Sequence, residues 1–138
     1  MQRSLEIDPS SYQAILLQAA NLSGLNRYGE AIDSYDYAIA LNPNTYEAWY
    51  ERGLALYALG RNEEAIASYD KAIEFSPGNH EAWYNKACCY ALQGHVDLAI
   101  DSLQHAVTMN AKNRELAKTD SDFDWIRESE QFHALIGA

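Results

Sequence analysis

Glu47-Ala48-Trp49-Tyr50 recurs 34 residues later as Glu81-Ala82-Trp83-Tyr84, and this repetition decides the fold. The match continues on both sides of the two tetrapeptides. Residues of one kind recur at the same spacing: small Ala19, Gly53 and Ala87; turn-forming Asn26, Gly60 and Gly94; and Ala31, Ala65 and Ala99. A fixed period of roughly 20 to 50 residues is typical of stacked-repeat proteins.

Within one period the apolar residues have helical spacing. Trp49, Gly53 and Leu56 form one stripe, and a second stripe consists of Ala65, Tyr69, Ala72, Ile73 and Phe75. Intervals of three and four are those of an amphipathic helix, and no stretch alternates as a strand would. Gly60 separates the two stripes and Pro77 closes the repeat, as residues that end helices do. Each repeat is therefore predicted to be two antiparallel helices joined by a tight turn.

This pattern of large, small and aromatic residues on the first helix, followed by alanine, aromatic and alanine on the second, resembles the tetratricopeptide repeat. The resemblance covers three repeats, at 12–45, 46–79 and 80–113. It implies an all-α fold, a right-handed superhelical solenoid of antiparallel helix pairs. The first repeat departs from the pattern at Ile15, where tryptophan is typical. The third has Ala111 in place of the final proline, so its last helix is expected to run on.

Both ends of the chain deviate from complete repeats. Residues 4–9 align, again at 34, with residues 38–43, so we interpret 1–11 as the remnant of a preceding repeat's second helix. A short N-terminal cap and a piece of a longer repeat protein both fit this pattern. Residues 114–138 are predicted to form a capping segment, because a terminal layer needs a cover that is apolar inside. Its inner face would consist of Phe123, Trp125, Ile126, Phe132 and Leu135.

The composition excludes several classes of partner. The 138-residue chain has a formal net charge of −10 and no basic cluster, which disfavours nucleic acid and anionic membrane surfaces. No apolar run reaches membrane-spanning length. Cys88 and Cys89 are adjacent and form no disulfide framework, so a cytoplasmic location is expected.

No combination of residues predicts a metal site, a cofactor site or catalysis. The four histidines, His80, His95, His105 and His133, share no ligand spacing. Asp120-x-Asp122-x-Asp124 has the spacing of a calcium loop, but Trp125 and Gln131 stand where that loop needs glycine and glutamate. Cys89 is predicted to be a buried apolar residue, and Cys88 to face the concave side with partial reactivity. No nucleophile can be matched to a neighbouring base, so an enzyme is not expected.

The resemblance implies that the first helices of successive repeats line a concave groove for a peptide. The residues of this predicted groove are Gln13, Leu16, Ala20, Glu47, Tyr50, Glu51, Leu54, Tyr57, Glu81, Tyr84, Asn85, Cys88 and Leu92. Tyr50, Tyr57 and Tyr84 are expected to be exposed aromatic anchors. The family's clamp for C-terminal carboxylates needs basic residues here, and Glu51 and Glu81 would repel a carboxylate. A chaperone co-factor of that type is therefore not expected.

The sequence predicts a protein-interaction scaffold. Its partner would be a protein or peptide with apolar anchors and basic flanks. The alternative is a structural module that assembles with itself or within a longer solenoid, without a dedicated peptide ligand. With either function, two copies are expected to pair as a homodimer through the N-terminal face, which carries the apolar residues Leu5, Ile7, Ile15, Leu16, Leu22 and Leu25.

Overall fold

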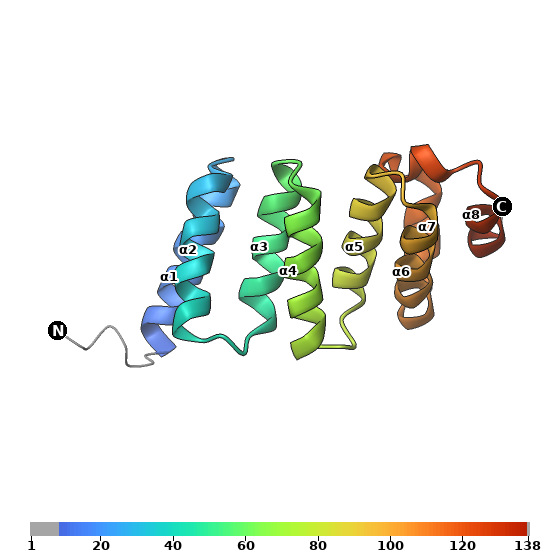
Figure 1. Cartoon of the computed structure of the whole chain (residues 1–138). Coiled ribbons are helices and arrows are strands. Elements are labelled where there is room, and N and C mark those ends of the chain that lie inside the picture. Colours follow the sequence, from blue (N-terminus) through green and yellow to red (C-terminus); the bar gives the residue numbers. More distant parts are fainter. Residues whose placement is uncertain (1–8, 138) are drawn as a thin grey trace. The chain divides into compact units, whose positions relative to one another are not determined.

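Figure 1 shows the computed structural model, which describes residues 9–137, with side chains from Ser11 onward. Within these residues every regular element is helical, as predicted, and none is long and apolar enough to cross a membrane. The chain divides into two compact units at Phe75 and Ser76.

The first unit is built from two helix pairs. Its helices are α1 (Pro9–Gly24), α2 (Tyr28–Leu41), α3 (Tyr46–Ala58) and α4 (Asn62–Phe75). Helix α1 packs on α2, α2 on α3, and α3 on α4. Helix α1 begins at Pro9, three residues before the expected start of the first repeat, and proline suits this first position because the missing N–H has no partner there. Leu5 and Ile7 lie outside the described residues.

The tight turns between paired helices follow one design. Asn26, Gly60 and Gly94 have positive φ angles of 63°, 77° and 78°. In each turn, the residue that follows donates its N–H to the carbonyl five residues earlier; for example, Arg61 donates to Leu56 at 2.9 Å. Within the ending helix this carbonyl accepts only an N–H that it shares with the preceding carbonyl, and the bond from the turn gives it a second donor. The turn positions predicted from the repeat are confirmed.

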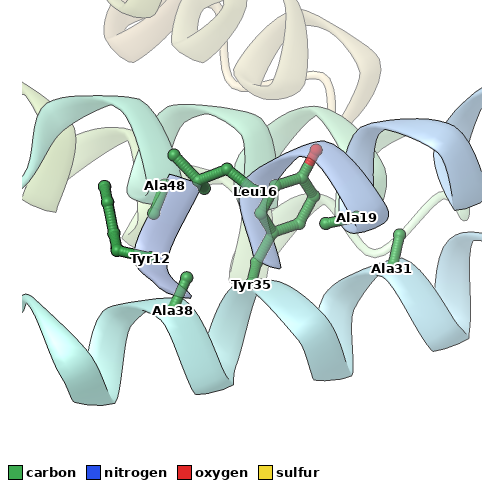
Figure 2. Close-up of a cluster of buried hydrophobic side chains, with 7 residues drawn as sticks. All are labelled: Tyr12, Leu16, Ala19, Ala31, Tyr35, Ala38 and Ala48. Atoms are coloured by element: carbon green, nitrogen blue, oxygen red, sulfur yellow. The ribbon is translucent and has the colours of Figure 1, made fainter. Parts of the chain in front are cut away.

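Alanines allow the first three helices to approach one another. Figure 2 shows Tyr35 extending from α2 to the α1 residues Leu16 and Ala19. The cluster consists of Tyr12, Leu16, Ala19, Ala31, Tyr35, Ala38 and Ala48, and all seven are buried. The alanines carry only a methyl group, so the tyrosine ring fills the space between the helix backbones.

Gly53 performs the same function between α3 and α4. A methyl group added at Gly53 would lie 2.5 Å from Cε1 of the fully buried Tyr69. Carbon atoms in contact are normally about 3.5–4.0 Å apart, so the tyrosine ring occupies the space that a larger residue would need. The small-residue position predicted from the repeat is thus a close contact between paired helices.

The second unit begins with one helix pair. Helix α5 (His80–Leu92) packs on α6 (Val96–Met109), and the Trp83 ring stacks on His105 with 4.0 Å between ring centroids. The expectation that the last helix of the third repeat continues past Ala111 is wrong. Helix α6 ends at Met109, and the Asn110 side chain accepts a hydrogen bond from the backbone N–H of Lys112 at the start of the next helix.

Three short elements complete the second unit: α7 (Lys112–Thr119), the 3-10 helix η2 (Ser121–Ile126) and α8 (Glu130–Ile136). Helix α8 packs on α6 and α7, whereas η2 packs on α5. Phe123, Ile126 and Phe132 are buried and Leu135 is half-buried, as expected for an inner face. Trp125 is 80% exposed, so its predicted place on that face is wrong. The short 3-10 turn places Phe123 and Ile126 inward and leaves the tryptophan outside.

Candidate functional site

The predicted groove residues fall into two sets, because the chain has two units. The first set lies on α1 and α3 and consists of Gln13, Leu16, Ala20, Glu47, Tyr50, Glu51, Leu54 and Tyr57. The second set lies on α5 and consists of Glu81, Tyr84, Asn85, Cys88 and Leu92. Intervals close to whole helical turns place each set along one side of its helix.

Three of these residues, Leu16, Tyr84 and Cys88, belong to the cores of their units. Leu16 and Tyr84 occupy the same position in their repeats and are only 7% and 8% exposed. Leu16 packs in the cluster that contains Tyr35 and Ala48. The expectation that Tyr84 is an exposed anchor is wrong, because this position packs against the chain that follows its helix. Tyr50 holds the same position in the second repeat and is half-buried.

The aromatic rings at the start of α3 form an ordered group. Tyr46 and Tyr50 stack with 5.3 Å between ring centroids and 16° between ring planes. Tyr50 also lies 5.9 Å from the buried ring of Tyr69 on α4. Such ring pairs stabilise by about 0.5–1.5 kcal/mol beyond the area they bury. The Tyr50 ring is therefore held in one orientation.

Glu47 and Glu51 form an acidic pair one turn apart on α3. Glu51 is half-buried and Glu47 is exposed. Burial raises the pKa of the Glu51 carboxyl, and the charge of Glu47 raises it further. Neither carboxylate has a basic partner within the described residues, whereas Glu30 and Glu64 on the neighbouring helices pair with Arg27 and Arg61. The pair is a concentration of uncompensated negative charge.

The hydroxyl of Tyr35 lies near this pair. Tyr35 is 1% exposed. Burial raises its pKa, and the charges of Glu51 and Glu47 add to the shift, so the hydroxyl keeps its proton. The hydroxyl oxygen makes no hydrogen bond of standard geometry within residues 9–137, although Ser23 on α1 lies within reach of a weak one. A buried hydroxyl without a full partner is costly, by about 1–3 kcal/mol.

Apolar side chains accompany the acidic pair. Leu17 on α1 is 64% exposed, and its position in the first repeat matches that of Glu51 in the second. Gln13 and Ala20 are exposed as well, while Leu54 and Tyr57 on α3 are half-buried. The first unit therefore presents apolar and acidic side chains on two helices that are first in their repeats.

The corresponding face of α5 is covered by the chain itself. The Tyr84 hydroxyl donates to Oδ2 of Asp120 at 2.8 Å. The fully buried Phe123 ring meets Tyr84 edge-on, with 5.7 Å between centroids and 78° between planes. The 3-10 helix η2 thus occupies this part of the second set, which the sequence pattern placed in an open groove.

Cys88 lies under the same cover. It is 3% exposed, and its Sγ lies 3.9 Å from Oδ2 of Asp120. Burial, together with the charges of Asp120 and Asp122, raises the pKa of the Cys88 thiol well above its usual range. A thiol that stays protonated is a poor nucleophile, so the expected partial reactivity of Cys88 is wrong. Cys89 is fully buried, as predicted, and burial raises its pKa to about 12.

Cys88, Asp120 and Asp122 form a cluster with a structural explanation. Their potential ligand atoms lie within 4.8 Å of one another. However, Oδ1 of Asp120 accepts the backbone N–H of Asp122 at 3.0 Å, and Oδ2 accepts the Tyr84 hydroxyl. Asp120 is the N-cap of η2, and these bonds account for the first acidic residue of the Asp-x-Asp-x-Asp stretch.

Sequence reasoning missed two pairs of side chains, each of which links the first and last residues of one repeat. The Tyr12 hydroxyl lies 2.6 Å from the Thr45 hydroxyl, and Nδ1 of His80 lies 3.0 Å from the side-chain nitrogen of Asn113. Both pairs join residues 33 positions apart, the first and last of a 34-residue repeat. The two pairs lie at equivalent positions of the 34-residue repeat, but their residue types differ, so no recurring motif marks the contact.

Sequence reasoning also missed Arg127. Its guanidinium donates to the carbonyls of Ala117, Lys118 and Asp120, with distances of 3.3, 2.7 and 2.6 Å, and to the carboxylate of Asp124. The first two carbonyls belong to the last turn of α7. Arg127 therefore caps α7 and fixes the bend into η2. Arg127 lies among acidic residues in a segment that matches no repeat, so the sequence gives no signal for this role.

Two models of the tetratricopeptide repeat match the chain, at residues 16–80 and 68–101, so that together they cover 16–101. With the helix pairs, the positive-φ turns and the small-residue contacts described above, these matches give the class of protein. The chain belongs to the tetratricopeptide repeat family. A search of the curated proteins gave no match.

Solved structures of low sequence identity share the fold. MamA is 18% identical with a TM-score of 0.79, and the match covers 94% of this chain and 74% of MamA. The Yersinia enterocolitica type III secretion chaperone SycD, in complex with a peptide of the translocator YopD, is 20% identical with a TM-score of 0.78 over 94% and 95%. YrrB, described as a tetratricopeptide repeat protein with an unusual peptide-binding site, is 24% identical with a TM-score of 0.73 over 79% and 57%. The predicted all-α, tetratricopeptide-like solenoid class is confirmed.

Proposed function

We propose that the first unit binds a peptide segment of a partner protein on the side of α1 and α3 that carries Leu17, Glu47, Glu51, Leu54 and Tyr57, called here the α1–α3 face. Protein interaction is the function that the family and the fold support. The observation that carries the proposal is the uncompensated Glu47–Glu51 pair, which lies among apolar side chains and has no basic partner in the described part of the chain.

This face fits a segment with apolar anchors flanked by lysine or arginine. Apolar anchors gain free energy by removing Leu17, Leu54 and Tyr57 from water, at about 25 cal/mol per Å² of apolar surface. Basic flanks would offset the charge of the glutamates and speed the encounter with a chain of net charge −10. The known structures of SycD with a YopD peptide and of YrrB support the proposal, because they are peptide-binding proteins with this fold.

Selection of peptides from a random display library on the full chain tests the proposal. The selected peptides should combine apolar and basic residues, and their association should slow as salt is added. Leu17→Asp should weaken their binding by about tenfold or more, which is typical of a lost anchor. Leu116→Asp is the matched control, because Leu116 on α7 is 56% exposed and lies in the other unit. Equal effects of the two substitutions would refute the α1–α3 face as the site.

Self-association is the second candidate function, and the exposed Leu25 favours it. Leu25 is 65% exposed near the end of α1, whereas Ile15 and Leu22 pack partly against the core and Leu16 is buried. The predicted pairing surface is therefore smaller than the sequence suggested. Sedimentation velocity over a range of concentrations tests it. A dimer that Leu25→Glu disperses would support pairing, and a monomer at every concentration would exclude it.

A further inference from the structure

The acidic pair on α3 differs in its surroundings from three acidic groups on the neighbouring helices. Glu30 and Glu64 are paired with arginines in the same helical turn, and Asp36 is paired with Arg52. Glu51 is more buried than any of these three and has neither an ion pair nor a hydrogen bond within residues 11–137. A half-buried carboxylate normally has such a partner, because desolvation penalises an unpaired charge.

The second observation is the Tyr35 hydroxyl, which comes from a different helix. It is buried, it lacks a hydrogen bond of standard geometry, and it lies where the charges of Glu51 and Glu47 act on it. Figure 2 shows the ring rising from α2 past Leu16 and Ala19, with the hydroxyl at the end remote from α2. A carboxylate pair without a cation, whose charge acts on a buried hydroxyl that lacks a full partner, is an arrangement that a cation would complete.

We propose that the α1–α3 face binds an arginine side chain of the partner, whose guanidinium pairs with the carboxylates of Glu51 and Glu47. This inference rests on the proposed function and names the basic residue that the face selects. The Tyr35 hydroxyl makes no hydrogen bond to Glu51 in the free chain; we assign it the role of a positioning group, which would donate to Glu51 once the guanidinium is bound. The occupant is an arginine within an apolar segment of another protein.

Arginine fits better than lysine for two reasons. The guanidinium has five donors in one plane, so it can bridge two carboxylates that lie one helical turn apart. It is also more weakly hydrated than an ammonium group, which lowers the cost of bringing it beside the half-buried Glu51 and the ring of Tyr50. A lysine would pair with one glutamate at a time and keep more of its water.

The test uses three capped peptides, acetyl-Gly-Leu-X-Leu-Gly-amide, in which X is arginine, lysine or citrulline. Citrulline has nearly the shape of arginine without its charge. The full chain, with its glutamates labelled with carbon-13 at the side-chain carboxyl, is titrated with each peptide by NMR. We expect the arginine peptide to bind about tenfold more tightly than the citrulline peptide, as one charge-assisted pair would give. It should also lower the pKa of Glu51, which the citrulline peptide should leave in place.

Variants separate this inference from the proposed function. Glu51→Gln should remove the preference for arginine over citrulline, and Tyr35→Phe should reduce it, while Glu63→Gln on α4 is the control that leaves it unchanged. If the arginine and citrulline peptides bind equally well and both shift the Leu54 amide signal, the arginine site is refuted. Peptide binding on the α1–α3 face would still be supported. Both the arginine site and peptide binding on the α1–α3 face would be overturned by two results together. None of the three peptides would shift the Leu54 amide signal, and Leu17→Asp would weaken the binding of no selected peptide.

Discussion

Substitution of Gly53 by alanine is the most direct test of how the helix pairs pack. The added Cβ would lie 2.5, 2.8 and 3.0 Å from three ring atoms of Tyr69. Contact distances for carbon are about 3.5–4.0 Å, so the ring and the Cβ must separate by about 1 Å. Tyr69 is fully buried, and its ring contacts Tyr50 as well, so it cannot move alone. Helices α3 and α4 must therefore move apart.

The size of the effect follows from two opposed terms. Overpacking a core costs about 1–3 kcal/mol, and the middle of this range is appropriate, because the first repeat holds Ala19 against Tyr35 with both residues buried. Alanine in place of glycine in a helix contributes up to about 1 kcal/mol of stabilisation. The net loss is therefore about 1 kcal/mol, or a fall in Tm of about 4–8 °C for a unit of this size.

Thermal unfolding followed by circular dichroism measures this loss. Gly29→Ala on α2 is the matched control, because nothing lies within 4 Å of an added Cβ there, and it should be neutral or slightly stabilising. Combining Gly53→Ala with Tyr69→Leu recreates the Ala87 and Leu103 pair of the third repeat, and the double variant should lose less than the sum of the single losses. If Gly53→Ala raises Tm as Gly29→Ala does, the packing argument is refuted.

Four further predictions concern the surface and the second unit. Glu51→Gln should raise the Tm of the free protein at neutral pH, because the folded-state pKa of this carboxyl is raised and its ionisation therefore destabilises the fold. That cost begins above the unfolded-state pKa and is complete above the folded-state pKa, so the gain should shrink as the pH falls through the folded-state pKa; a gain independent of pH would contradict this. Phe123→Ala should make Cys88 react with a thiol reagent in the folded protein, and unchanged protection would show that η2 does not cover the thiol. Arg127→Met should cost about 2 kcal/mol in urea unfolding through lost carbonyl partners, a loss that Arg127→Lys should restore only in part. Trp125→Ala should leave Tm within about one degree of the parent, since its ring is largely exposed, and a large fall would mean that the ring packs in the core.

The features that the sequence predicts well are those that repeat with the period. Gly60 and Gly94 predict their turns because only the left-handed conformation closes them, and Asn26 takes that conformation as the non-glycine residue best suited to it. Gly53 predicts a close helix contact because its partner Tyr69 lies within the same repeat. In each case the cause is local to one helix pair, so one period contains all the information.

The features that the sequence does not predict depend on residues outside the period. Tyr84 carries the same signal as Tyr50, yet its burial is set by Phe123, which lies in a segment with no counterpart in the other repeats. The same segment buries Cys88. Trp125 reads as an inner-face residue by composition, and only the 3-10 geometry of η2 turns it outward. Helical periodicity does not apply to a segment that is not an α-helix.

The contacts between Tyr12 and Thr45, and between His80 and Asn113, bear on how such repeats can be exchanged between proteins. In each pair the first residue of a repeat holds the last, so the span 12–45 or 80–113 carries both halves of the bond within itself. A graft that takes these spans whole would transfer the bond intact into a new host. A graft cut only a residue or two inside either span would split the bond and leave a polar side chain to find a partner in the host. The best joints for recombining these repeats therefore lie just outside the bonded pair, at a register that helix boundaries alone would not reveal.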